Sequence, residues 1–255
     1  MQESEVKIPL KPTNLYIYGT LRGSYKLPLI VLCHGYGGWM HEMLLYNAAR
    51  YFEKEGFATL RLSMYGGGEW SRDISRSDVL THASDIDSVA SYVKEKGVKW
   101  IGVVGHSYSG MAIVYSRQQT FDSAVLWDPT HTDGYDTPQS IKSLKDDFVF
   151  VDEQQVYMSG KGSGNIYAET VFDNKYPKSR EMASRFNIPT CVINASWNHD
   201  QLRYGKDYVD SIKAVAEQVI IPGSSHPFTE DGVAEKLFGV TAVYFKKQIL
   251  ESHDS

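Results

Sequence analysis

Residues 100–119 read WIGVVGHSYSGMAIVYSRQQ, and this stretch decides the fold class of the chain. Its first five residues are apolar enough for a strand that is buried on both faces, and residues 108–119 have the spacing of a helix. Between them lies GHSYSG (105–110), a sharp turn from strand to helix. Such a turn holds the hydroxyl of Ser107 at the edge of a sheet. We therefore take Ser107 as a candidate nucleophile in an α/β fold.

The turn departs at one place from the G-x-S-x-G pattern. Ser109 stands where the second glycine is usual, and because serine is small we expect tighter packing rather than a broken turn. The backbone N–H of Tyr108 is predicted to face the same space as the Ser107 hydroxyl, where it would stabilise a developing negative charge. The alternative is a structural glycine turn with a bystander serine.

The segments on both sides repeat the alternation of strand and helix. We expect strands at residues 14–22, 27–33, 57–62, 100–104, 123–127, 189–195 and 218–221. We expect helices at residues 42–54, 108–119, 204–216 and 233–250, and one long helix that follows the loop 65–69 and ends at about residue 96. This alternation predicts a mostly parallel sheet flanked by helices, with ligands at the carboxyl ends of the strands. We expect one domain over 1–255, in which residues from about 130 to 185 form a cap insertion.

Composition excludes several function classes. The 255 residues carry a net charge of −5 with no basic stripe, which argues against a nucleic-acid partner. The sequence contains no run of 18 apolar residues, so no membrane span is predicted. Residues 1–5 lack the basic and apolar features of a secretion signal. Cys33 and Cys191 lie in strand-like runs and are predicted to be buried thiols, so we expect a cytoplasmic protein. The sequence leaves the oligomeric state open.

A second glycine-rich loop follows the apolar strand that ends at Cys33. This loop reads HGYGG (34–38), and its flexibility can aim a backbone N–H, that of Tyr36, at a substrate carbonyl oxygen. With Tyr108 it is predicted to form an oxyanion hole, the pair of N–H groups that stabilises a tetrahedral intermediate. His34 is expected to orient this loop rather than to transfer protons.

Three segments, HGYGG (34–38), ATLRLSMYGGG (58–68) and GHSYSG (105–110), together resemble the α/β-hydrolase superfamily. The resemblance is to its branch of single-domain serine esterases, lysophospholipase-like lipases and acyl-thioesterases. It covers almost the whole chain outside residues 130–185. It implies a sheet of about eight strands, a short cap insertion after the sixth strand, and no metal or organic cofactor. Members often carry an aspartate where this chain has Ser63 or Met64.

In this superfamily the nucleophile is followed along the chain by an acid and then by a histidine. His226, in GSSHPF (223–228), is the only one of the eight histidines in the expected place, before the closing helix. Asp200, the only carboxylate of the loop SWNHD (196–200), is the preferred acid. Asp128 is the alternative, because some members place the acid after the preceding strand.

Large side chains on loops at the same edge are candidates for an apolar substrate pocket, although they can equally anchor the loops: Trp39, Met40, Trp70 and Trp197. The predicted function is a serine hydrolase that cleaves a carboxylic ester of small or medium acyl chain through an acyl-enzyme on Ser107. The alternatives are an acyl-thioesterase or acyltransferase, an amidase, a haloperoxidase-like or lyase activity of the same triad, and a non-catalytic ligand-binding homologue. The expected partner is a small-molecule acyl substrate.

Overall fold

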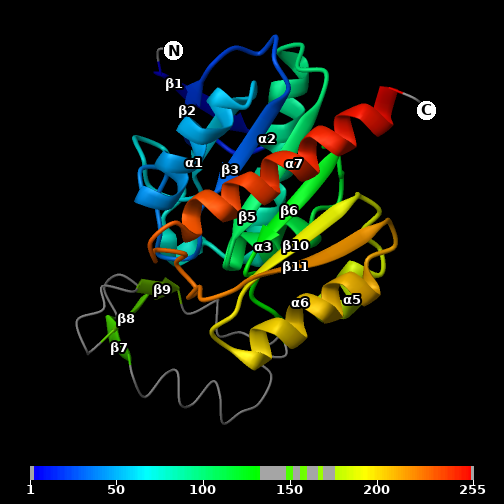
Figure 1. The fold of residues 1–255 in the computed structure, drawn as a ribbon. Coiled ribbons are helices and arrows are strands. Elements are labelled where there is room, and N and C mark those ends of the chain that lie inside the picture. The colour runs from blue at the N-terminus through cyan, green and yellow to red at the C-terminus, as the bar shows by residue number, and fades with distance from the viewer. Residues whose placement is uncertain (1–2, 133–147, 152–155, 160–165, 169–175, 254–255) are drawn as a thin grey trace.

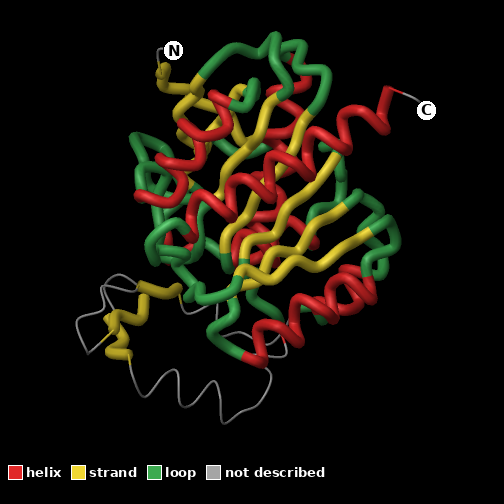
Figure 2. Tube along the Cα trace, viewed as in Figure 1, coloured by secondary structure: helices red, strands yellow, loops and turns green. Residues whose placement is uncertain are grey.

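The computed structural model describes residues 3–132, 148–151, 156–159, 166–168 and 176–253. A twisted eight-stranded sheet runs through the molecule, with helices on both faces (Figures 1 and 2). Its strands, in sheet order, are β1 (Glu3–Leu10), β2 (Leu15–Arg22), β4 (Ala58–Ser63), β3 (Leu29–Cys33), β5 (Ile101–His106), β6 (Ser123–Trp127), β10 (Thr190–Ala195) and β11 (Ala216–Ile221). Strand β2 pairs antiparallel with β1 and β4, and the other pairs are parallel. The predicted sheet is confirmed.

Strand β3 shows why the central strands are apolar throughout. Leu29, Val31 and Cys33 point into one hydrophobic core, and Ile30 and Leu32 point into the other. The first core is closed by α2 (Val79–Glu95), α3 (Tyr108–Val114), α5 (Ser179–Ala183) and α6 (His199–Ser211). The second is closed by α1 (Met43–Lys54) and α7 (Val233–His253). Because side chains alternate between the faces, a strand covered on both sides needs apolar residues at every position.

Both cysteines are buried free thiols, as expected. Cys33 belongs to the first core and Cys191 to the second, so the sheet separates them.

Two elements differ from the expectation. Strand β1 has the sequence ESEVKIPL, which begins with polar residues. It pairs antiparallel with β2 along its whole length, and its Ile8 and Leu10 are buried in the first core. Helix α6 begins at His199, five residues earlier than its apolar spacing predicts. Its first turn is fixed by Asn198, whose side chain accepts a hydrogen bond of 2.8 Å from the N–H of Asp200. Side-chain capping of this kind stabilises a helix start that hydrophobic periodicity does not reveal.

Between β6 and α5 lies a separate antiparallel sheet of three short strands, β7 (Phe148–Val151), β8 (Val156–Ser159) and β9 (Ile166–Ala168). Strand β9 contacts the short 3₁₀ helix η1 (Ile74–Arg76). These strands fall inside the predicted cap insertion. The two ends of that insertion, residues 130–132 and 176–185, are also described and include α5, whereas residues 133–147, 152–155, 160–165 and 169–175 lie outside the described residues.

The topology brings four loops to one edge of the sheet. Strands β5, β6, β10 and β11 are parallel neighbours in that order, so the segments after their carboxyl ends are adjacent in space. These segments carry Ser107, Asp128, Trp197 and His226 respectively.

Candidate active site

The candidate nucleophile lies on a strained turn between β5 and α3. Ser107 has φ 54° and ψ −116°, a backbone conformation that is rare for residues other than glycine. Its N–H donates to the carbonyl of Trp127 at 2.9 Å, and its carbonyl accepts from the N–H of Thr130 at 3.1 Å. Strain of this kind costs about 1–3 kcal/mol and persists only where the surroundings enforce it. Here the neighbouring strand β6 and the segment after it enforce it.

Small residues allow the close approaches around this turn. A Cβ on Gly105 would lie 2.6 Å from the backbone of Ser109, so no larger residue fits there. A Cβ on Gly35 would lie 3.2 Å from the Cβ of Ser107, which shows how closely the HGYGG loop passes the nucleophile. Ser109 itself is fully buried, and its hydroxyl donates to the carbonyl of His34 at 2.6 Å. The serine in place of glycine therefore joins the two loops.

Three side chains from distant parts of the chain form one hydrogen-bonded series, which we call the triad. Nε2 of His226 lies 2.9 Å from Oγ of Ser107, and Nδ1 of His226 lies 2.6 Å from Oδ2 of Asp128. A carboxylate only accepts, so Nδ1 carries the proton and Nε2 is the acceptor for the serine hydroxyl. The imidazole is thus in the tautomer that can remove a proton from Ser107.

The carboxylate of Asp128 is completely buried and accepts four hydrogen bonds. Oδ2 accepts from His226 and from the indole Nε1–H of Trp197 at 3.1 Å. Oδ1 accepts from Nδ2 of Asn194 at 3.1 Å and from the backbone N–H of Ala195 at 3.2 Å. Burial by itself raises the pKa of Asp128, but the hydrogen bonds from His226, Trp197 and Asn194 outweigh it and hold the pKa below its ordinary value. The group is therefore a carboxylate at neutral pH.

The preferred acid of the sequence analysis, Asp200, does not lie beside His226. It is in the first turn of α6, its side chain is 70% exposed, and its carboxylate faces Arg203 at 3.4 Å. The reason is the early start of α6 at Asn198, which directs residue 200 along the helix surface and away from the triad. The alternative acid, Asp128, occupies the position against the imidazole.

One polar residue that supports the candidate acid, Asn194, was missed from the sequence. Asn194 donates to Asp128, and its Oδ1 accepts from Nε2 of Gln218 at 2.8 Å, so its amide orientation is fixed. A fully buried amide at the end of the apolar strand TCVINA is the signal that could have identified it. Trp197, which was predicted as a pocket residue, donates its indole N–H to the carboxylate of Asp128 at 3.1 Å.

His106 supports the base. Its Nε2–H donates to the backbone carbonyl of His226 at 2.9 Å, and the two imidazole rings lie 4.8 Å apart. Burial, and then the nearby His226, lowers the pKa of His106 to about 4. The neutral imidazole therefore anchors the loop of His226 without adding a positive charge next to it.

The HGYGG loop is fixed by His34, as expected. Nδ1–H of His34 donates to the carbonyl of Gly35 at 2.7 Å, and Nε2 accepts from the N–H of Met64 at 3.0 Å. Burial lowers its pKa to about 4, so the ring stays neutral and keeps both contacts. The side chains of Tyr36 and Tyr108, the two predicted oxyanion donors, pack edge to face with ring centroids 4.9 Å apart.

A buried histidine lies beneath these two rings. The imidazole of His82 stacks on Tyr36 at 6.0 Å, meets Tyr108 at 5.4 Å and lies 5.9 Å from the ring of Tyr65. Among the described residues, neither ring nitrogen of His82 has a hydrogen-bond partner. Burial keeps its pKa well below the ordinary value. The ring therefore acts as a neutral packing element under the HGYGG loop.

The other predicted pocket residues lie differently. Met40 is buried, and its sulfur accepts a hydrogen bond of 3.6 Å from the hydroxyl of Thr20. It is therefore part of the core. Trp39 and Trp70 are 58% and 60% exposed, and Trp197 is 51% exposed. Of these four residues, the hydrogen bonds found in the described part of the chain tie only Trp197 to the triad.

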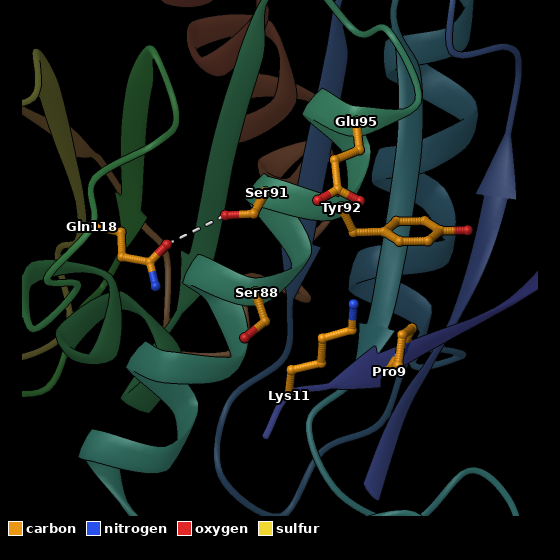
Figure 3. A pocket seen from close by; sticks show the side chains of 7 residues that line it. All are labelled: Pro9, Lys11, Ser88, Ser91, Tyr92, Glu95 and Gln118. Atoms are coloured by element: carbon orange, nitrogen blue, oxygen red, sulfur yellow. Dashed lines mark hydrogen bonds between the residues drawn. The ribbon is translucent and has the colours of Figure 1, made fainter. Parts of the chain in front are cut away.

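Two surface cavities lie away from the triad. One, of about 230 Å³, sits between the end of β1 and helix α2 (Figure 3) and is lined by Pro9, Lys11, Ser88, Ser91, Tyr92, Glu95 and Gln118. The other, of about 440 Å³, lies between β11 and α7 and is lined by Glu217, Gly239, Val240, Val243, Tyr244 and Lys247. Neither lining includes a residue of the triad.

Over the described ranges, no helix has the length and apolar character needed to cross a membrane. In the same part of the chain, no cluster of histidine, cysteine and carboxylate side chains is arranged to hold a metal ion.

Comparison by sequence finds short matches. No family model matches the chain. Over 100 residues it is 33% identical to an "Uncharacterized 31.7 kDa protein in traX-finO intergenic region" of Escherichia coli, a match that covers 38% of this chain and 35% of that protein. A second protein of the same description is 34% identical over 91 residues, 34% of this chain and 32% of its own length. The chain thus spans about a third of the curated relatives it matches.

Comparison by structure covers nearly the whole chain. Est1E of Butyrivibrio proteoclasticus, solved with ferulic acid, has a TM-score of 0.75 at 16% identity, over 96% of this chain and 99% of that one. Alpha/beta hydrolase domain-containing protein 10 from mouse gives 0.71 at 13% identity, over 96% and 99%. Dienelactone hydrolase of Anabaena variabilis gives 0.69 at 17% identity, over 96% and 97%. At these identities the likeness is one of fold.

Proposed function

We propose that this chain, which has the α/β-hydrolase fold, is a serine hydrolase that cleaves carboxylic esters through an acyl-enzyme on Ser107. The observation that carries the proposal is the continuous series from Ser107 Oγ to His226 at 2.9 Å and from His226 to Asp128 at 2.6 Å. The three groups have the roles of nucleophile, base and orienting acid. This assignment makes Asp128 the acid in place of Asp200.

The reaction begins at the hydroxyl of Ser107. As Oγ forms a bond to the acyl carbon, its proton moves to Nε2 of His226, and the ester carbonyl becomes an oxyanion. The buried carboxylate of Asp128 stabilises the imidazolium that forms. His226 then gives the proton to the departing alcohol as the bond between carbon and leaving oxygen breaks.

Water completes the cycle by the same groups. His226 takes a proton from water while the water oxygen bonds to the acyl carbon. The bond from that carbon to Oγ then breaks, and Ser107 regains its proton from His226. The products are a carboxylic acid and the alcohol, and the enzyme returns to its first state.

The backbone N–H groups of Tyr36 and Tyr108 are the proposed oxyanion hole. Tyr108 opens helix α3 directly after the nucleophile, where the helix dipole favours negative charge. The loop of Tyr36 passes close to Ser107 at Gly35 and is locked by His34. Two fixed donors stabilise an oxyanion by several kcal/mol relative to water, because they need not reorient during the reaction.

A fluorophosphonate probe tests the nucleophile. We expect the wild type to be labelled and the Ser107→Ala variant to remain unlabelled while folded. Ser184→Ala, at an exposed serine away from the triad, is the matched control and should still be labelled. A folded wild type that does not react would contradict the proposal and favour a non-catalytic ligand-binding protein.

A substrate panel tests the ester assignment. We propose small or medium acyl chains, and the esterase domain of a Rhodothermus marinus protein, which has a similar fold, supports the choice of ester. Matched p-nitrophenyl esters, acyl thioesters and anilides of graded chain length should give the highest kcat/KM for an ester. A thioester preferred over every ester would overturn this assignment in favour of the acyl-thioesterase while leaving the nucleophile unchanged.

A further inference from the structure

Trp197 occupies an unusual place for a half-exposed aromatic residue. Its Nε1–H lies 3.1 Å from Oδ2 of Asp128, the same oxygen that lies 2.6 Å from Nδ1 of His226. The indole ring is 6.1 Å from the imidazole ring of His226. One oxygen of the acid therefore serves both the base and the indole.

The sheet order explains how the indole reaches the acid. Trp197 follows β10, which lies between β6, the strand before Asp128, and β11, the strand before His226. Its loop is tied to the His226 loop twice. The N–H of Ser196 donates to Oγ of Ser224 at 3.2 Å, and Oγ of Ser196 accepts from the N–H of Gly223 at 2.9 Å. The indole N–H is thus held toward the carboxylate by the backbone around it.

Burial alone does not account for a tryptophan at this position. The residue is 51% exposed, so the N–H is the feature that distinguishes it from phenylalanine in this environment. A donor on a carboxylate spreads part of its negative charge and weakens its attraction for another proton. The indole therefore competes with His226 for the charge on Oδ2.

We propose that Trp197 is a positioning residue that fixes the carboxylate of Asp128 and limits its pull on the proton of His226. This inference rests on the proposed function, because it assigns to Trp197 control over the basicity of the proposed base. Without the indole N–H, more of the negative charge on Oδ2 faces the imidazolium, and Asp128 attracts it more strongly.

Several other titratable groups surround His226 and also affect its charge. From β5 and its turn come Ser107 and the imidazole of His106, which stays neutral. From β6 comes Asp128. On the loop of His226 itself, the carboxylate of Glu230 accepts from the N–H of Ser225 at 2.9 Å. The charged partner that Trp197 contacts is Asp128.

The test is the pH profile of fluorophosphonate labelling for the wild type and Trp197→Phe, which keeps an aromatic ring and removes the donor. We expect the acid limb of the labelling rate to move to higher pH by about half a unit. Trp100→Phe is the matched control, because it makes the same substitution at a tryptophan that packs against Phe245 in the second core, away from the triad. Its acid limb should coincide with that of the wild type.

A second measurement does not depend on reactivity. In the wild type, the indole Nε1–H resonance of Trp197 in a ¹⁵N spectrum should titrate together with the His226 imidazole. The imidazole of Trp197→Phe should titrate at higher pH. Coincident acid limbs and imidazole titrations in the two proteins would overturn the role of Trp197. A folded wild type that is never labelled would instead remove the proposed function.

Discussion

The hydroxyl of Ser109 donates a hydrogen bond of 2.6 Å to the backbone carbonyl of His34, across 75 positions of sequence. This contact joins the turn of the nucleophile to the HGYGG loop at a fully buried point. The residue that departs from the G-x-S-x-G pattern thus has a structural partner that glycine would lack.

Removing this hydroxyl should destabilise the protein. In Ser109→Ala the carbonyl of His34 stays buried without its donor, so we expect a loss of about 1–2 kcal/mol in the free energy of unfolding, measured by urea denaturation. Ser184→Ala is the control, because the Ser184 hydroxyl also donates to a backbone carbonyl, at 2.7 Å, but at an exposed site. Equal losses in the two variants would show that the buried hydrogen bond of Ser109 contributes no more to stability than the exposed one of Ser184.

The two candidate acids predict opposite results for two conservative substitutions. Asp128→Asn should lower kcat/KM for an ester by about 10³- to 10⁴-fold, because an amide stabilises neither the imidazolium nor the required tautomer. Asp200→Asn should leave kcat/KM within about twofold, because its side chain is 70% exposed on the surface of α6. The reverse ranking would exclude Asp128 as the acid.

The buried imidazole of His82 should make the free energy of unfolding depend on pH. Burial keeps its pKa below 6.5 in the folded state, with His34 and Arg72 adding repulsion, so the unfolded chain binds the proton more readily. As the pH falls below about 6.5, wild type should therefore lose about 1.4 kcal/mol of stability per pH unit relative to His82→Leu. Urea unfolding of both proteins across this range measures the difference, and parallel curves would refute it.

Glu42 should give the opposite dependence. Its Oε2 lies 2.5 Å from the point where a Cβ on Gly38 would be. Burial raises the pKa of Glu42 from 4.5 to about 7, and a hydrogen bond with the backbone of Trp39 partly offsets this rise. The folded state thus binds this proton more tightly, and stability is lost as the pH rises from 4.5 to 7. Wild type should lose at most about 3 kcal/mol relative to Glu42→Gln over this interval. Thermal unfolding at both ends of the interval tests this expectation, and an unchanged difference between the two proteins would contradict a raised pKa of Glu42.

Much of this arrangement could be predicted from the sequence. The apolar strand before Gly105 and the helical spacing after it predict the turn, and the chain order of the fold then selects His226. These features depend on local pattern, which repeats in every strand covered on both faces. The predicted sheet is accordingly found in the structure.

The position of the acid could not be predicted in the same way. Asp200 and Asp128 both follow a strand of the parallel sheet, and the difference arises from the capping side chain of Asn198, which starts α6 early. The roles of Asn194 and Trp197 depend on contacts between neighbouring strands. Such contacts are set by sheet order and register, and no spacing along a single chain encodes them.

The positive φ of Ser107 has a consequence for any attempt to improve this protein. Glycine adopts φ 54° without the steric cost that serine bears, so Ser107→Gly should gain stability while it loses the hydroxyl. A library of variants screened only for thermal stability would therefore enrich Ser107→Gly, which lacks the hydroxyl. Under the proposed role of Ser107, directed evolution of this chain has to score turnover in every round, because thermal stability favours glycine at this position and catalysis requires serine.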